Sequence, residues 1–239
     1  MRLYHLSIAN LAAALAACGA DTAEAPAPQA SETPSAARPD IAVEGPERRI
    51  LAFGDSLFAG YGVGEENSYP ALLEDALREQ GINARIANAG VSGDTSQAGA
   101  QRLAFTLDTQ AEKPDLVILE LGGNDMLRGV SPDQTRASFE AMLGKLRQRD
   151  IPVLLMGMRA PPNYGPEYQT QFDGLYSELA RQYDAELIPF WLEAIYQNPS
   201  LFQSDRIHPT VEGIEALVAD TADEVAAALP PAAALPPAN

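Results

Sequence analysis

The sequence predicts an α/β protein built as a three-layer α/β/α sandwich with about five parallel strands in the middle layer. Short runs rich in aliphatic residues alternate along the chain with helix-like segments, which is typical of βαβ units joined by right-handed crossovers. The clearest candidate for a buried strand, Asp115 to Leu121, lacks the alternation of a half-buried strand, as expected where helices cover both faces of a sheet. We therefore expect a flavodoxin-like sheet with strand order 2-1-3-4-5.

The first half of the chain supplies three of these strands. An apolar run that begins at Ile50 ends abruptly in Gly54-Asp55-Ser56, as a buried strand that reaches the carboxyl edge of the sheet would. The segment from Tyr69 to Gln80 has apolar residues at helical spacing and stops at Gly81, a suitable residue to follow a helix. The next elements expected are a strand over 84–89, a helix over 96–109 and the strand 115–121, which runs into Gly122-Gly123-Asn124-Asp125.

The second half continues the alternation. Ser131-Pro132 opens a helix that extends to about Arg149, because a proline at the first helical position removes an N–H that has no partner there. The remaining elements expected are a strand over 152–158, a helix over 167–183, a short strand over 185–189 and a last helix over 209–229.

Length and charge limit the possible functions. The chain has 239 residues, 46% of them hydrophobic, which is enough for one well-packed domain, expected over 48–229 and to act as a monomer. The formal net charge is -17, so the sequence offers no basic surface for a phosphate backbone. We therefore expect no nucleic-acid partner.

The amino terminus resembles a bacterial export signal. Residues 1–17 combine Arg2 with an apolar stretch too short to span a bilayer. Leu15 to Cys18 resembles the lipobox of bacterial lipoproteins, and Cys18 is the sole cysteine. The resemblance implies lipidation of Cys18 and a location on the periplasmic face of the outer membrane; the alternative is a secreted or periplasmic soluble protein with an incidental cysteine. Residues 18–47 and 230–239 are rich in Pro and Ala, and we expect a linker and a tail there.

Polar residues follow the predicted strands at one edge of the sheet. Ser56 follows the first strand, and Asp205 and His208 precede the last helix. His208 is the only histidine left after removal of the signal, and a carboxylate three residues before it can fix the tautomer that accepts a serine proton. These residues therefore predict a Ser-His-Asp triad, although Asp and Ser after a strand also serve as helix caps. A zinc site at Asp205 and His208 is disfavoured, because one His and no Cys supply too few ligands; we expect no metal.

Two further strand ends complete the predicted site. Gly93 follows the second strand and Asn124 the third. With the backbone N–H of Ser56, the Gly93 N–H and the Asn124 side-chain amide would form an oxyanion hole of three neutral donors. The alternative is an ordinary turn glycine and a capping asparagine.

At these residues the chain resembles the GDSL, or SGNH, hydrolase family, whose four blocks are led by Ser, Gly, Asn and His. The matching blocks are Gly54-Asp55-Ser56-Leu57, Ser92-Gly93-Asp94-Thr95, Gly122-Gly123-Asn124-Asp125 and Asp205-Arg206-Ile207-His208-Pro209. The runs SGDTSQAG and LGGNDMLRG are similar to the thioesterase I / lysophospholipase L1 / arylesterase branch in particular. The resemblance implies a serine acyl hydrolase that needs no cofactor. Phe58 stands where the elbow of α/β-hydrolases has its second glycine, which separates the chain from that fold.

The resemblance also suggests a substrate wall. In that branch the loop after the fourth strand borders the acyl groove, so Arg159 to Tyr168 is the candidate wall, with Pro162, Asn163 and Tyr164 as candidates for substrate binding. Asp55 is a further candidate for substrate binding. A plain Pro-rich surface loop is the alternative. The expected substrate is a small acyl ester or a lysophospholipid. A carbohydrate O-acetylesterase and a non-catalytic lipid- or glycan-binding lipoprotein remain alternatives.

Overall fold

The computed structural model describes residues 41–231. The predicted signal peptide, the lipidation site Cys18, most of the linker and the tail from 232 lie outside the described residues. Within residues 41–231, no helix combines the length and the apolar character that crossing a membrane requires.

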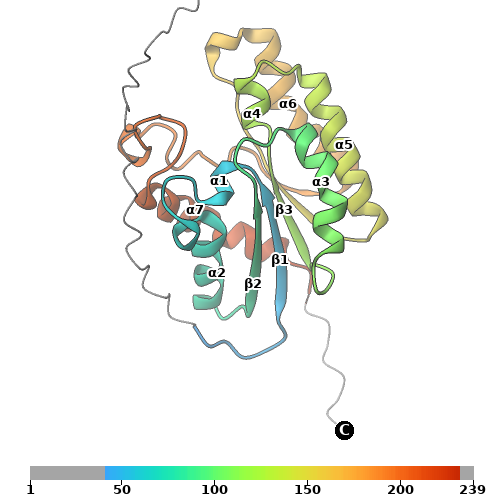
Figure 1. Ribbon diagram of the computed structural model, residues 1–239, viewed down its shortest axis with the longest axis vertical. Helices are drawn as coiled ribbons and strands as arrows, with labels where there is room; N and C mark the ends of the chain where they lie inside the picture. Colours follow the sequence, from blue (N-terminus) through green and yellow to red (C-terminus); the bar gives the residue numbers. More distant parts are fainter. Residues whose placement is uncertain (1–40, 232–239) are drawn as a thin grey trace, which may run out of the picture. The chain divides into compact units, whose positions relative to one another are not determined.

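A sheet of five parallel strands forms the middle layer, and its strand order is β2-β1-β3-β4-β5, as predicted (Figure 1). The strands are β1 (Arg48–Gly54), β2 (Ala84–Gly90), β3 (Leu116–Glu120), β4 (Val153–Met156) and β5 (Glu186–Ile188). Every residue of β3 and β4 is buried, whereas the edge strands β2 and β5 keep exposed positions. The continuous apolar runs are therefore the strands that helices cover on both faces.

Helices cover both faces of this sheet (Figure 1). On one face α2 packs against α7, and on the other α3 packs against α5 and α5 against α6. The α-helices are α1 (Ser56–Ala59), α2 (Tyr69–Glu79), α3 (Ser96–Asp108), α4 (Gly123–Leu127), α5 (Pro132–Gln148), α6 (Pro166–Tyr183) and α7 (Val211–Ala228), and the short 3-10 helices are η1 (Glu65–Asn67), η2 (Pro162–Tyr164) and η3 (Pro199–Leu201). The predicted three-layer sandwich is confirmed.

The long elements begin and end within a few residues of the predicted positions. The last helix starts at Val211 and not at Pro209, because the Thr210 side chain caps it by accepting a hydrogen bond from the Gly213 N–H (3.2 Å). The short helices α1 and α4 were not predicted, since one turn carries no periodic pattern. Both stand directly after a strand, at the carboxyl edge of the sheet.

The described fold also begins earlier than the expected residue 48. The Ile41 carbonyl accepts a hydrogen bond from Arg78 Nε (2.8 Å), and the Gly45 carbonyl accepts one from Asn83 Nδ2 (3.0 Å). Residues 41–47, expected as the end of the linker, are thus fastened to the domain by their backbone. Because only carbonyl groups make these contacts, the side-chain pattern gave no sign of them.

Candidate active site

Ser56 stands at the junction of β1 and α1, where the chain turns sharply out of the sheet. Asp55 caps α1, since its Oδ1 accepts a hydrogen bond from the Leu57 N–H (3.0 Å). The turn rests on a buried aromatic cluster in which the Phe58 ring lies 5.3 Å from the Tyr69 ring and 5.7 Å from the Trp191 ring. The hydroxyl of Ser56 is thereby held at the carboxyl edge of the sheet on a rigid support.

The structure brings His208 and Asp205 to this hydroxyl. His208 Nε2 lies 2.9 Å from Ser56 Oγ, and His208 Nδ1 lies 2.7 Å from Asp205 Oδ2. Desolvation raises the pKa of Asp205. Hydrogen bonds from the His208 ring and from the Ile207 and His208 N–H groups outweigh this effect and lower the pKa to about 2. Asp205 is therefore ionised at neutral pH and fixes the imidazole so that Nε2 faces the serine.

The three residues predicted to supply oxyanion donors, Ser56, Gly93 and Asn124, line one pocket. Within residues 41–231, neither the Ser56 N–H nor the Gly93 N–H donates to another protein group. Gly93 adopts φ +85°, a conformation that favours glycine, and lines the same pocket as Ser56 and Asn124. Among the described residues, the Asn124 amide is held by one bond, from Nδ2 to Asp55 Oδ2 (2.9 Å), which leaves its second N–H available.

Two buried carboxylates that the sequence analysis did not single out stand behind these donors. Asp125 accepts hydrogen bonds from the Ser96 N–H (2.7 Å) and from the Thr135 hydroxyl (3.1 Å), which ties the loop after Gly93 to the loop that holds Asn124. Glu120, at the end of β3, accepts a bond from the Asp55 N–H (3.2 Å). An acidic residue inside an otherwise apolar strand was the sequence signal for Glu120, because an unpaired carboxylate is costly to bury.

A cavity of about 550 Å³ opens beside Ser56 and His208. Its size is within the usual range for small-molecule sites. The apolar part of its lining consists of Leu57, Tyr61, Met126, Leu127, Met158, Pro161, Phe190, Leu192, Tyr196, Pro199, Phe202 and Ile207. The edge of the sheet that carries Ser56 therefore borders a mostly apolar pocket.

The predicted substrate wall is only partly at this pocket. Asp55, Arg159 and Pro161 line it, but Pro162, Asn163 and Tyr164 do not. These three residues form η2; Pro162 and Asn163 face solvent, and the Tyr164 ring packs 5.2 Å from that of Tyr168. The segment 190–202 lines the pocket instead, a role that the sequence analysis missed. Its aromatic and aliphatic residues after a three-residue strand were the available signal.

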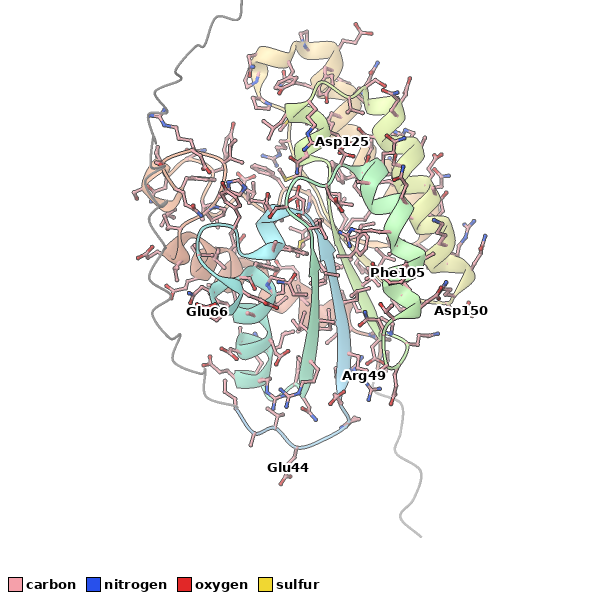
Figure 2. The ribbon with its side chains drawn as sticks, in the orientation of Figure 1. Glu44, Arg49, Glu66, Phe105, Asp125 and Asp150 are labelled. Carbon is pink, nitrogen blue, oxygen red and sulfur yellow. The ribbon has the colours of Figure 1, made fainter. Side chains whose placement is uncertain are left out.

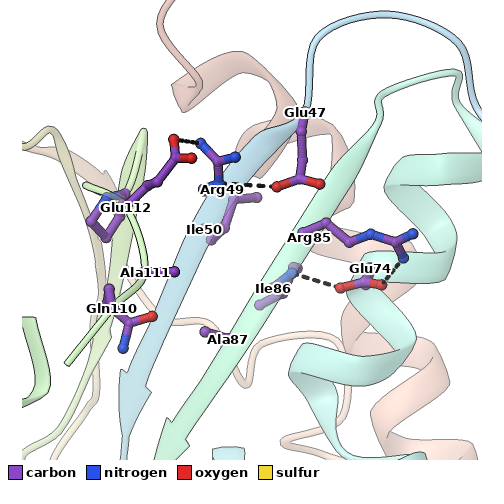
Figure 3. A pocket seen from close by; sticks show the side chains of 11 residues that line it. Glu47, Arg49, Ile50, Glu74, Arg85, Ile86, Ala87, Gln110, Ala111 and Glu112 are labelled. Carbon is purple, nitrogen blue, oxygen red and sulfur yellow. Dashed lines mark hydrogen bonds and ion pairs between the residues drawn. The ribbon is translucent and has the colours of Figure 1, made fainter.

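A second hollow, of about 230 Å³, lies at the amino edge of the sheet (Figure 3). Arg49 pairs there with Glu47 (3.0 Å) and with Glu112, and Arg85 pairs with Glu74 (3.2 Å). Figure 2 places Arg49 and Asp125 toward opposite ends of the sheet. The described residues that line this second hollow include no serine, histidine or cysteine, so the hollow has no nucleophile or imidazole base of the kind that acyl transfer uses.

Comparison with known proteins relates this geometry to characterised hydrolases. Residues 52–216 match the sequence model of the GDSL-like Lipase/Acylhydrolase family. Esterase TesA of Pseudomonas aeruginosa is 41% identical over 162 residues, which cover 68% of this chain and 80% of that protein. Thioesterase 1/protease 1/lysophospholipase L1 of Escherichia coli strain K12 is 41% identical over 160 residues, 67% of this chain and 74% of that protein. The crystal structure of AlinE4, an SGNH-hydrolase family esterase, is 60% identical with a TM-score of 0.67 over 78% of this chain and 99% of that one.

Proposed function

Since the chain belongs to the GDSL-like lipase/acylhydrolase family, we propose that it cleaves carboxylic esters by a serine mechanism in which Ser56, His208 and Asp205 form the triad. The observation that carries this proposal is the continuous chain of hydrogen bonds from Ser56 Oγ through the His208 ring to Asp205 Oδ2. The sequence predicted these three residues, and the geometry supports the role proposed for each.

In the first half of the reaction, Ser56 Oγ attacks the ester carbonyl carbon while its proton passes to His208 Nε2. The carbonyl oxygen becomes an oxyanion, which accepts hydrogen bonds from the Ser56 and Gly93 N–H groups and from Asn124 Nδ2. The tetrahedral intermediate then expels the alcohol or thiol, which takes the proton from His208. Water attacks the acyl-enzyme with His208 as base in the second half, and the carboxylic acid leaves.

The pocket supports an acyl chain longer than acetyl. Four of the large apolar side chains that line it are also strongly exposed, at fractions of 42 to 52%: Tyr61, Leu127, Tyr196 and Ile207. Exposed apolar groups gathered around one opening indicate a binding surface. Each buried methylene of a substrate contributes about 0.8 kcal/mol, so medium-chain esters gain most from this lining.

The leaving group that we propose is that of a lysophospholipid. Arg206, two residues before His208, lines the pocket, and its side chain makes no hydrogen bond or ion pair within residues 41–231. It can therefore neutralise one phosphate. Acyl-CoA carries more negative charge, which a chain of net charge -17 repels more strongly at low ionic strength.

A fluorophosphonate probe tests the nucleophile. It should label Ser56 and abolish ester hydrolysis, and the Ser56→Ala protein should neither react nor turn over substrate. Labelling that survives Ser56→Ala would refute the triad.

A substrate series tests the pocket. kcat/KM should rise from acetyl to medium-chain p-nitrophenyl esters, and lysophosphatidylethanolamine should be hydrolysed faster than acyl-CoA of matched chain length at low salt. If acetyl esters are the best substrates and activity is lost beyond butyrate, carbohydrate O-acetylesterase activity becomes the better proposal.

Anchoring to the outer membrane through Cys18 is a separate proposal, supported by the lipobox-like residues 15–18. Expressed in a bacterium, the wild-type protein should partition with membranes and incorporate labelled palmitate, and the Cys18→Ala protein should do neither. Equal solubility of the two would support the secreted or periplasmic soluble alternative.

A further inference from the structure

The Asp55 carboxylate is almost fully buried, with 2% of the residue exposed, and each of its oxygens has a different partner. Oδ1 accepts from the Leu57 N–H (3.0 Å), and Oδ2 accepts from Asn124 Nδ2 (2.9 Å). An ionised carboxylate can accept hydrogen bonds but cannot donate them. The amide of Asn124 must therefore turn its nitrogen, and not its oxygen, toward Asp55.

From this contact we infer that Asp55 is a positioning residue, which fixes the rotation of the Asn124 amide so that its second N–H points at the developing oxyanion. The inference rests on the proposed function, because it needs Asn124 to act as an oxyanion donor. Without Asp55 the amide could rotate about its last side-chain bond, and in half of its orientations an oxygen would face the oxyanion. A donor that must be reoriented during the reaction stabilises the transition state less than one already in place.

Glu120 supports this role from behind. Its Oε2 accepts from the Asp55 N–H (3.2 Å), and a Cβ at residue 54 would lie 2.8 Å from the same atom, so Gly54 allows the approach. Burial, and then the charge of Asp55, raise the pKa of Glu120 well above its ordinary value. Burial also raises the pKa of Asp55, but the hydrogen bonds from Leu57 and Asn124 offset part of that rise. Burial therefore favours the protonated form of Glu120, whereas the hydrogen bonds from Leu57 and Asn124 favour the ionised form of Asp55.

Two substitutions of Asp55 separate its capping role from its positioning role. Asp55→Ser keeps an N-cap oxygen for the Leu57 N–H, but the shorter side chain cannot reach Asn124. Asp55→Asn keeps the size, but its own NH₂ group then faces one of the two donors. Both should lower kcat for a medium-chain p-nitrophenyl ester by about 10- to 100-fold with KM nearly unchanged, because the lost bond acts in the transition state. If Asp55→Asn fails to fold, Asp55→Ser carries the experiment.

The decisive measurement is a double-mutant cycle with Asn124→Ala in the full-length chain. If Asp55 acts through Asn124, its substitution should cost less than about 3-fold in kcat in the Asn124→Ala background. An equal loss in both backgrounds would overturn the inference, since Asp55 would then act on the fold or on Ser56 alone. An Asn124→Ala protein with unchanged kcat would overturn it as well. The proposed function fails on a different result, namely hydrolysis or probe labelling that survives Ser56→Ala.

Asp125→Asn is the matched control. Asp125 is equally buried, with 1% exposed, and neighbours Asn124 in sequence, but its carboxylate accepts from Ser96 and Thr135 and not from the Asn124 amide. Its substitution should lower the melting temperature and cost the same fold-change in kcat in both backgrounds. If Asp125→Asn also lost its effect in the Asn124→Ala background, the coupling would belong to the whole loop and the assignment to Asp55 would fail.

Discussion

The two edges of the sheet use carboxylates in opposite ways. At the carboxyl edge Asp55, Glu120 and Asp125 are at most 2% exposed, and they hold backbone N–H groups, a hydroxyl and an amide in fixed orientations. At the amino edge the carboxylates that hold Arg49 are open to solvent, with 39% of the Glu47 side chain and 62% of the Glu112 side chain exposed (Figure 3).

The buried carboxylates of the carboxyl edge belong to the proposed active site, whereas the exposed ion pairs of the amino edge contribute surface charge, which supports solubility. A buried carboxylate costs desolvation free energy unless donors surround it, as they surround Asp55 and Asp125, so its position is determined by the whole site. An exposed ion pair contributes little to the free energy of unfolding, so removing it costs little stability. We therefore expect substitutions at the carboxyl edge to change kcat by orders of magnitude. Substitutions at the amino edge should leave kcat almost unchanged.

The largest effect should come from the nucleophile. Ser56→Ala should lower kcat by about 10⁵-fold or more, because attack and proton transfer both need the hydroxyl. Its melting temperature should change little, since the substitution removes one half-buried oxygen. A Ser56→Ala protein that keeps a tenth of wild-type activity would contradict the assignment of Ser56 as the nucleophile.

The next effect should come from the charge that orients the histidine. Asp205→Asn should lower kcat by about 10³- to 10⁴-fold, because the amide no longer selects the imidazole tautomer. The substitution also has a pH signature. A pKa of about 2 in the folded state, below the unfolded value of about 3.9, means that ionised Asp205 stabilises the fold above pH 4 and that this contribution is lost as pH falls toward 2.

Denaturant titrations between pH 4 and pH 2 check that signature. The free energy of unfolding of Asp205→Asn should fall less steeply with decreasing pH than that of the wild type. Equal slopes would mean that the hydrogen bonds from the His208 ring and from the Ile207 and His208 N–H groups do not hold Asp205 as the structure indicates.

The residues Ser56, Asp205 and His208 also show how far sequence reasoning can reach. Their proximity was predictable, because Ser56 follows a recognisable strand end, Asp205 and His208 precede a helix, and parallel strands bring such positions to one edge. The pocket wall was not predictable, since segment 190–202 has little secondary structure and its place depends on tertiary packing. The roles of Asp55 and Glu120 were also hidden, because a side chain's partners 65 and 69 residues away leave no local pattern.

A third and smaller effect concerns the oxyanion hole. Asn124→Ala should lower kcat by about 10²- to 10³-fold and leave KM nearly unchanged, because the amide bond strengthens only when the carbonyl oxygen becomes charged. Steady-state kinetics with a medium-chain ester measure both constants. A rise in KM with constant kcat would make Asn124 a substrate-binding residue and not an oxyanion donor.

The smallest effect should come from the amino edge. Glu112→Gln removes one partner of Arg49 but leaves Glu47, whose Oε1 lies 3.0 Å from Arg49 Nε. Since an exposed pair contributes at most about 1 kcal/mol and salt screens it, the free energy of unfolding should fall by less than that, and the difference should vanish in 1 M NaCl. kcat/KM should stay within about twofold of wild type, because Arg49 and Glu112 lie at the edge opposite the triad. A tenfold loss of activity in Glu112→Gln would show that the two edges are coupled through β1, and the separation between catalysis and surface charge would not hold.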